Sequence, residues 1–186
     1  MKAAVHLSST RADFHAALGQ LLADRQQIQA AVESLGRAVE LEQGSAEYAY
    51  DLGLALRLAG DFEGAETQFR RALERVPAHG LAHRALGLVL RQRGDLDGAA
   101  SALRAATAVL PTDAQAHHLL GSVLLKADRE GALEALERSV ALDPHSTEAR
   151  ATLAQALARA GRREDALREQ AEVTRINAEN AGVGRA

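Results

Sequence analysis

The chain has 186 residues, a net charge of -3 at pH 7 and only 3% aromatic residues. Nucleic-acid-binding proteins usually carry a concentrated basic surface and aromatic side chains that stack on bases, so this composition disfavours that class. Cysteine is absent, which excludes disulfides, thiolate metal sites and cysteine nucleophiles.

Residues 1–11 (MKAAVHLSSTR) are expected to form a lead-in to the folded part of the chain. Their short apolar run contains His6 and is too short for the core of a secretory signal. No apolar run elsewhere approaches the roughly 18 residues that span a bilayer. We therefore expect a soluble, cytoplasmic protein without membrane insertion.

Glycines and prolines recur with a period of 33 or 34 residues. Four glycines lie inside apolar-periodic stretches: Gly19, Gly53, Gly87 and Gly121. Glycine inside a helix costs about 0.5–1 kcal/mol relative to alanine, so a close helix contact is expected at each. Three prolines follow amphipathic runs and are predicted to end helices: Pro77, Pro111 and Pro144.

The second copy of this period predicts two antiparallel helices at residues 46–59 and 62–75, joined by a short link at Gly60 and Asp61. The fourth copy has lost one residue and its turn glycine, and a tighter turn is expected there. The first copy has Gln26 in place of the turn glycine, and the fifth has Ala154 in place of the helix glycine. Terminal repeats are expected to be atypical because one of their faces meets water.

The residue order in the central copies resembles the tetratricopeptide repeat: Leu-Gly, a large residue, Ala-x3-Phe and a closing proline. The second copy carries it as Leu52-Gly53, Leu56, Ala65, Phe69 and Pro77. The resemblance implies an all-α, right-handed α-solenoid of five helix-turn-helix repeats in a single domain, residues 12–177. The expected repeats are 12–45, 46–79, 80–113, 114–146 and 147–177, followed by a C-terminal tail at 178–186.

The segment GDLDGA at residues 94–99 has two interpretations, a calcium loop or a turn between helices. A calcium loop needs oxygen ligands at its first and twelfth positions, where this chain has Arg93 and Arg104. The segment also repeats as GDFEGA at residues 60–65. It is therefore predicted to be a turn, in which Gly94 ends one helix and Asp95 caps the next.

Histidine is the one residue type that suggests a metal site, because His15, His83 and His117 share one phase of the repeat. Equivalent positions in stacked repeats lie about 10 Å apart, whereas zinc ligands must lie about 2 Å from one metal. These histidines are instead expected at half-buried packing positions. No Gly-x-Ser-x-Gly elbow and no glycine-rich phosphate loop is present, so we expect no enzyme activity, catalytic residue, metal or cofactor.

The remaining candidate is a surface. In tetratricopeptide arrays the first helix of each repeat lines a concave groove that usually binds extended peptides. Matched positions in this chain predict a peptide-binding groove of Tyr50, Leu54, Arg57, Leu81, Arg84, Leu88, Arg91, His118, Ser122, Leu125 and Lys126. Its centre is basic, and Arg84 and Arg91 lie two turns apart on one helix, where they are expected to pair with carboxylates.

The sequence thus predicts a non-enzymatic protein–protein interaction module, or scaffold, that binds an extended, acidic segment of another protein. The alternative is a structural subunit that self-assembles or resides permanently in a larger complex. A face of small residues on the outer helix of the third repeat favours the alternative: Gly98, Ser101, Ala105 and Ala108. The sequence leaves open whether the chain forms a homo-oligomer.

Overall fold

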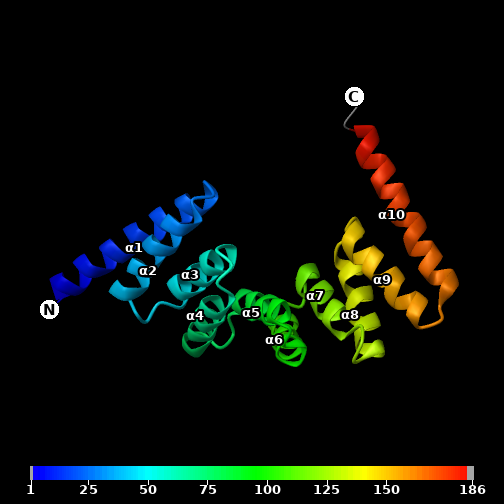
Figure 1. Ribbon diagram of the computed structural model, residues 1–186, viewed down its shortest axis with the longest axis horizontal. Helices are drawn as coiled ribbons and strands as arrows, with labels where there is room; N and C mark the ends of the chain where they lie inside the picture. Colours follow the sequence, from blue (N-terminus) through cyan, green and yellow to red (C-terminus); the bar gives the residue numbers. More distant parts are fainter. Residues whose placement is uncertain (1, 184–186) are drawn as a thin grey trace. The chain divides into compact units, whose positions relative to one another are not determined.

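The computed structural model describes the backbone of residues 2–183 and the side chains of residues 11–181. Within that range the chain forms ten helices and no strand (Figure 1). The helices are α1 (Lys2–Asp24), α2 (Ile28–Leu41), α3 (Ala46–Leu58), α4 (Phe62–Arg75), α5 (Gly80–Arg93), α6 (Leu96–Val109), α7 (Ala114–Leu124), α8 (Arg129–Leu142), α9 (Thr147–Arg159) and α10 (Arg163–Val183). The all-α class predicted from the sequence is confirmed.

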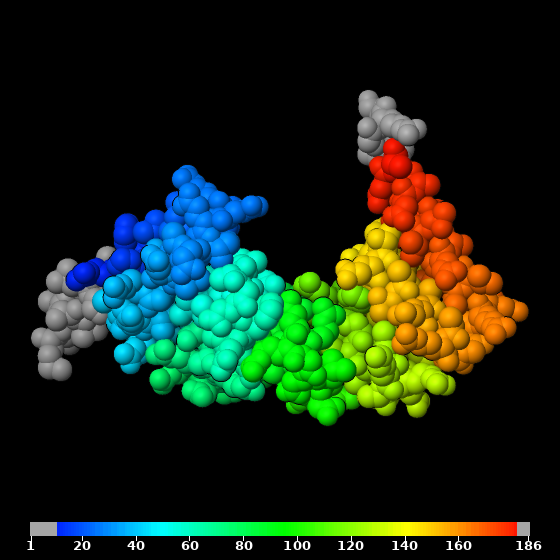
Figure 2. Space-filling view, in the orientation of Figure 1, coloured from blue at the N-terminus to red at the C-terminus, as the bar shows by residue number. Residues whose placement is uncertain are grey.

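The chain divides into two compact units, unit 1 at Met1–Gly98 and unit 2 at Ala99–Ala186. In unit 1, α1 packs on α2 and α3 on α4, and α5 packs against α4. In unit 2, α7 packs on α8 and α9 on α10, while α8 also contacts α9. In Figure 2 the surface of unit 1 passes in chain order from blue through cyan to green. Each unit is therefore built mainly from contacts between helices that are neighbours in sequence.

Helix starts follow from side-chain caps. Asp61 accepts a hydrogen bond from the Gly64 amide at the start of α4 (2.8 Å), and Asp128 accepts one from the Gly131 amide at the start of α8 (2.9 Å). An oxygen at this position satisfies an amide that has no partner inside the helix. Asp95 does the same for the Gly98 amide at 2.9 Å, and Gly94 ends α5 in the left-handed conformation with φ 85°. The GDLDGA segment is thus a helix–helix turn, as predicted.

The recurring helix glycines mark close helix contacts. A Cβ atom placed on Gly53 would lie 2.6 Å from Cε1 of Phe69, which is fully buried. A Cβ atom on Gly121 would lie 2.5 Å from Cγ of Leu136 and 3.0 Å from the carbonyl oxygen of Ala132. These separations leave no room for a side chain, which explains why glycine is retained in spite of its helix cost.

The two chain ends and the turn of the fourth repeat differ from the sequence-based expectation, and the turn of the first repeat adds a detail to it. α1 begins at Lys2 and α10 continues to Val183, so helix occupies much of the segments expected as a lead-in and a tail. The shortened fourth repeat has a four-residue connection at 125–128, against three residues at 59–61, so the tighter turn was wrong and the missing residue shortens α7 instead. Gln26, in place of the turn glycine, takes a φ of 59°, the conformation that glycine would adopt readily.

Candidate peptide-binding surface

Seven of the eleven residues of the predicted groove lie in unit 1, on α3 and α5. We call their surface, together with the adjoining part of α1, the first-helix face. It includes Gln20, Tyr50, Asp51, Leu54, Arg57, Leu81, Arg84, Leu88 and Arg91. The predicted residues among these are half-buried, except Leu81, which is 40% exposed. The face thus combines apolar side chains with cations that reach solvent.

Tyr50 lies at the centre of the interactions on this face. Its ring packs in a tilted arrangement against His79, with centroids 5.0 Å apart, and against Phe69 at 5.9 Å. Burial raises the pKa of the Tyr50 hydroxyl, Arg84 lowers it, Asp51 raises it and Arg57 lowers it. The structure therefore brings Tyr50, Arg57 and Arg84, which the sequence assigned to one groove, within electrostatic reach of one another.

Asp51 is a half-buried carboxylate whose hydrogen-bond partner is neutral. Gln20 of α1 donates from Nε2 to its Oδ2 at 2.8 Å. Burial raises the pKa of Asp51, the Gln20 hydrogen bond lowers it, Glu47 raises it and His79 lowers it. No cation of the described residues forms an ion pair with this carboxylate. Asp51 therefore carries a charge that burial disfavours and that no described side chain neutralises.

The four predicted groove residues of unit 2 have different surroundings. His118 is 8% exposed, and its Nε2 lies 3.1 Å from the Thr152 hydroxyl, which itself donates to the Glu148 carbonyl. The Ser122 hydroxyl donates to the Leu119 carbonyl at 2.7 Å. Leu125 packs against a buried cluster, and Lys126 is exposed in the following turn. Of these four residues, His118 is buried, Ser122 and Leu125 are half-buried, and Lys126 is exposed.

Two of the three histidines that share one phase of the repeat, His83 and His117, have a structural role. His83 Nε2 lies 2.8 Å from the carbonyl oxygen of Pro77, and His117 Nε2 lies 3.2 Å from that of Pro111. In the next repeat Arg150 Nε donates to the Pro144 carbonyl at 2.8 Å. A donor six residues after each proline therefore satisfies its carbonyl, which is consistent with the packing role expected for these positions. Among the described residues, no three metal-ligating side chains lie close enough to share an ion.

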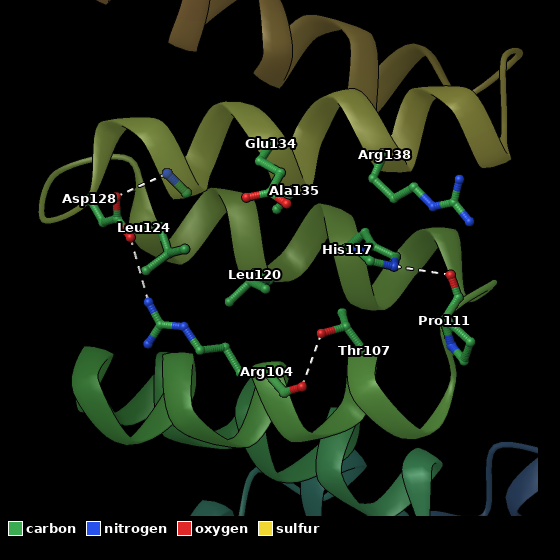
Figure 3. Close-up of a pocket in the computed structure, with 11 residues that line it drawn as sticks. Arg104, Thr107, Pro111, His117, Leu120, Leu124, Asp128, Glu134, Ala135 and Arg138 are labelled. Atoms are coloured by element: carbon green, nitrogen blue, oxygen red, sulfur yellow. Dashed lines mark hydrogen bonds and ion pairs between the residues drawn. The ribbon is translucent and has the colours of Figure 1, made fainter.

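Unit 2 also contains a pocket of about 550 Å³ that the sequence did not indicate. Figure 3 shows its lining from α6, α7 and α8, with Leu120 and Leu124 of α7 in the interior. Arg104 of α6 pairs with Asp128 at 3.6 Å at one end, whereas Glu134 and Arg138 of α8 line the opposite wall. The lining carries equal numbers of cations and carboxylates, so its electrostatics select neither charge.

Asp51, Gln20 and His79 were missed by the sequence analysis, although a signal for Asp51 exists. Its counterparts one repeat before and after are Ala17 and Ala85. A charged residue at a position where the neighbouring repeats have an apolar residue indicates that the side chain does not take part in packing between repeats. Gln20 and His79 carry no comparable signal, because their roles depend on which neighbours they meet.

The helix pairs, their glycine contacts and the proline-bounded connections define a helical-repeat protein of the α-solenoid class. The family comparison agrees: the tetratricopeptide repeat model matches residues 16–79, 59–114 and 84–130, and a second model of this repeat matches 124–184. The chain belongs to the tetratricopeptide repeat family. Proteins of this family are generally non-enzymatic interaction modules, and the fold is that of a protein-interaction scaffold.

Solved structures give the same result for the fold. MamA (residues 41 to the end) from Desulfovibrio magneticus RS-1 is 26% identical with a TM-score of 0.83, over 91% of this chain and 96% of MamA. PilF of Pseudomonas aeruginosa is 19% identical with a TM-score of 0.80, over 90% of this chain and 77% of PilF. YrrB, described as a tetratricopeptide repeat protein with an unusual peptide-binding site, is 22% identical with a TM-score of 0.74, over 87% of this chain and 84% of YrrB.

A search of curated proteins gave no match. Within the described residues, every helix is too short or too polar to cross a bilayer.

Proposed function

We propose that this chain is a non-enzymatic scaffold whose first-helix face binds an extended, acidic segment of another protein. The main supporting observation is the pairing of cations with apolar side chains on α3 and α5. Arg57 and Arg84 lie within electrostatic reach of Tyr50, and Leu81, on the same helix as Arg84, is 40% exposed. A guanidinium group can donate two parallel hydrogen bonds to one carboxylate, so this face suits an acidic chain with apolar side chains.

The proposal extends to Arg91, which the sequence places two turns from Arg84 on the same helix. Arg57 is the sharper residue to test because it is half-buried and forms no ion pair within the described part of the chain. Reversal of its charge should therefore remove an attraction to ligand without breaking an internal contact.

The test begins with an affinity pull-down on the intact protein, followed by calorimetry on the captured partner. Arg57→Glu combined with Arg84→Glu should weaken binding at least tenfold, about 1.4 kcal/mol, and binding of the parent chain should weaken with salt. Arg75→Glu is the matched control, because Arg75 is an exposed arginine at the end of α4, outside the first-helix face. Equal affinities for the double variant and the control would contradict the proposal.

Self-assembly, or residence in a larger complex, is the second candidate. It is favoured by the outer face of α1, where Phe14 is 64% exposed and Leu21 is 48% exposed. Large exposed apolar side chains on one helix face are typical of contact surfaces. Light scattering at high concentration tests homo-assembly directly. A monomer there would remove that part of the alternative, whereas an oligomer dispersed by Phe14→Glu and Leu21→Glu would support it.

A further inference from the structure

The first-helix face of unit 1 carries charges of both signs, and they are arranged in order. Asp51 lies toward α1, where it accepts the Gln20 hydrogen bond at 2.8 Å. Arg57 lies further along α3, and Arg84 lies on α5. Tyr50 interacts electrostatically with all three charged groups, so the carboxylate and the guanidinium groups belong to one surface.

Asp51 differs in its partners from Glu66, the buried carboxylate of unit 1. Glu66 is 6% exposed, and it accepts hydrogen bonds from both Arg70 and Arg93. Asp51 instead has the neutral amide of Gln20 and the electrostatic influence of His79. A half-buried carboxylate without an ion-pair partner favours the approach of a cation, because the cation offsets the cost of burying the charge.

We infer that the segment bound by this face carries a basic residue that pairs with Asp51 and, about three residues away, an acidic residue that pairs with Arg84 or Arg57. The spacing follows from geometry. Asp51 and Arg84 lie on the first helices of neighbouring repeats, about 10 Å apart, and Arg57 lies six residues after Asp51 on α3, about 9 Å along the helix axis. An extended chain advances about 3.3 Å per residue. The inference rests on the proposed function, to which it adds the second charge and its distance from the first.

Electrostatic complementarity of this kind affects specificity more than total affinity. A purely acidic segment would meet Arg57 and Arg84 favourably but would place a carboxylate near Asp51 and Glu47. A segment with both charges satisfies both ends of the face. The face should therefore bind mixed-charge segments more tightly than purely acidic ones. Its affinity should also depend on the order of the two charges along the segment.

The test uses a displayed library of random twelve-residue peptides as the probe, selected on the intact chain. We expect the enriched peptides to carry Lys or Arg about three positions from Asp or Glu, in one order. Asp51→Asn keeps the shape of the side chain and removes its charge, and selection on it should lose the basic position but keep the acidic one. Glu74→Gln, which alters an exposed carboxylate of α4, should leave both positions unchanged.

A double-mutant cycle then measures the pair itself. For one enriched peptide, replacing its basic residue by alanine should lower affinity for the parent chain about fivefold, since a partly exposed ion pair contributes about 1 kcal/mol. The same replacement should have little effect on binding to Asp51→Asn.

The outcomes separate the two proposals. Enriched peptides that are acidic only, and equally so on Asp51→Asn, would overturn the mixed-charge inference and leave the proposed function standing. The absence of enriched peptides, or enrichment that Arg57→Glu with Arg84→Glu leaves unchanged, would overturn both.

Discussion

Tyr50 of unit 1 and His118 of unit 2 occupy equivalent positions of the repeat, and their surroundings differ. Tyr50 is half-buried beside two arginines that reach solvent, whereas His118 is 8% exposed and lies within hydrogen-bond distance of Thr152. The next positions along the same stripe differ similarly, since Arg57 forms no ion pair with any residue whose side chain the structure describes, and Leu125 packs against a buried cluster. Register in a repeat therefore places a residue on a helix face, and its neighbours decide whether its side chain reaches solvent or is buried.

The largest expected effect tests what the two units share. Gly53→Leu and Gly121→Leu should each destabilise the protein by about 1–3 kcal/mol or more, because the new side chain overpacks a filled helix contact. Denaturant midpoints measure this. Gly36→Ala is the control: its Cβ atom would meet no atom within 4 Å, so helix propensity should make it neutral or stabilising by up to about 1 kcal/mol. Tolerance of Gly121→Leu alone would show that the two units pack differently.

The next prediction sharpens the contrast between surface and interior. His118→Ala should lower the unfolding free energy by about 1–3 kcal/mol, because it removes a buried hydrogen bond and leaves a cavity. Arg57→Ala should change the unfolding free energy by about 0.5 kcal/mol or less, as is usual for surface substitutions. Thermal or chemical denaturation of the two variants compares them directly. Equal losses would remove the distinction drawn between the two units.

A smaller difference is expected among the donors to the proline carbonyls. Arg150 donates to Pro144 and also pairs with Glu169 at 2.5 Å, with 13% of its side chain exposed. His83 makes the single proline contact described for it. Arg150→Ala should therefore cost about 1.5–3 kcal/mol and His83→Ala about 1 kcal/mol. The reverse order in urea midpoints would show that the ion pair of unit 2 contributes little.

The smallest effect concerns Asp51 and depends on pH. Because burial raises the folded-state pKa of this carboxyl above its unfolded value, ionisation favours the unfolded chain. The penalty is absent below the unfolded pKa of about 3.9, builds up as pH rises toward the folded pKa, and persists above it. Asp51→Asn should therefore raise the melting temperature slightly at pH 7 and leave it unchanged at pH 3. A lower melting temperature of Asp51→Asn at pH 7 would mean that the ionised carboxylate of Asp51 stabilises the folded protein in the absence of a ligand.

The sequence predicted much of this fold because the repeat encodes its contacts locally. Gly53 and Phe69 form one close contact in the second repeat, and each element of the pattern has a direct physical cause. The predicted helices at 46–59 and 62–75 agree to within one residue with the observed bounds of α3 (Ala46–Leu58) and α4 (Phe62–Arg75). The division into repeats at 12–45 through 147–177 stays a prediction.

Other features depend on contacts that one position cannot show. The deletion in the fourth repeat shortened α7 rather than its turn, because Asp128 still caps α8. His118 lies within hydrogen-bond distance of Thr152, one repeat later, and the half-buried carboxylate of Asp51 accepts a hydrogen bond from Gln20, one repeat earlier. The roles of these two residues thus depend on partners from another repeat, which their own positions in the sequence do not show.

The packing of neighbouring helices through glycine also bears on how quickly the chain folds. Contacts such as Gly53 with Phe69 and Gly121 with Leu136 join residues of the same helix pair, and the capped start of α4 or α8 is set by residues three positions apart. Little loop-closure entropy is lost in forming them. Proteins dominated by such short-range contacts fold in microseconds to milliseconds, and in repeat arrays the nucleus can form at any pair. A substitution in one helix pair should therefore lower the free energy of unfolding but change the folding rate little, because the other pairs can still form the folding nucleus.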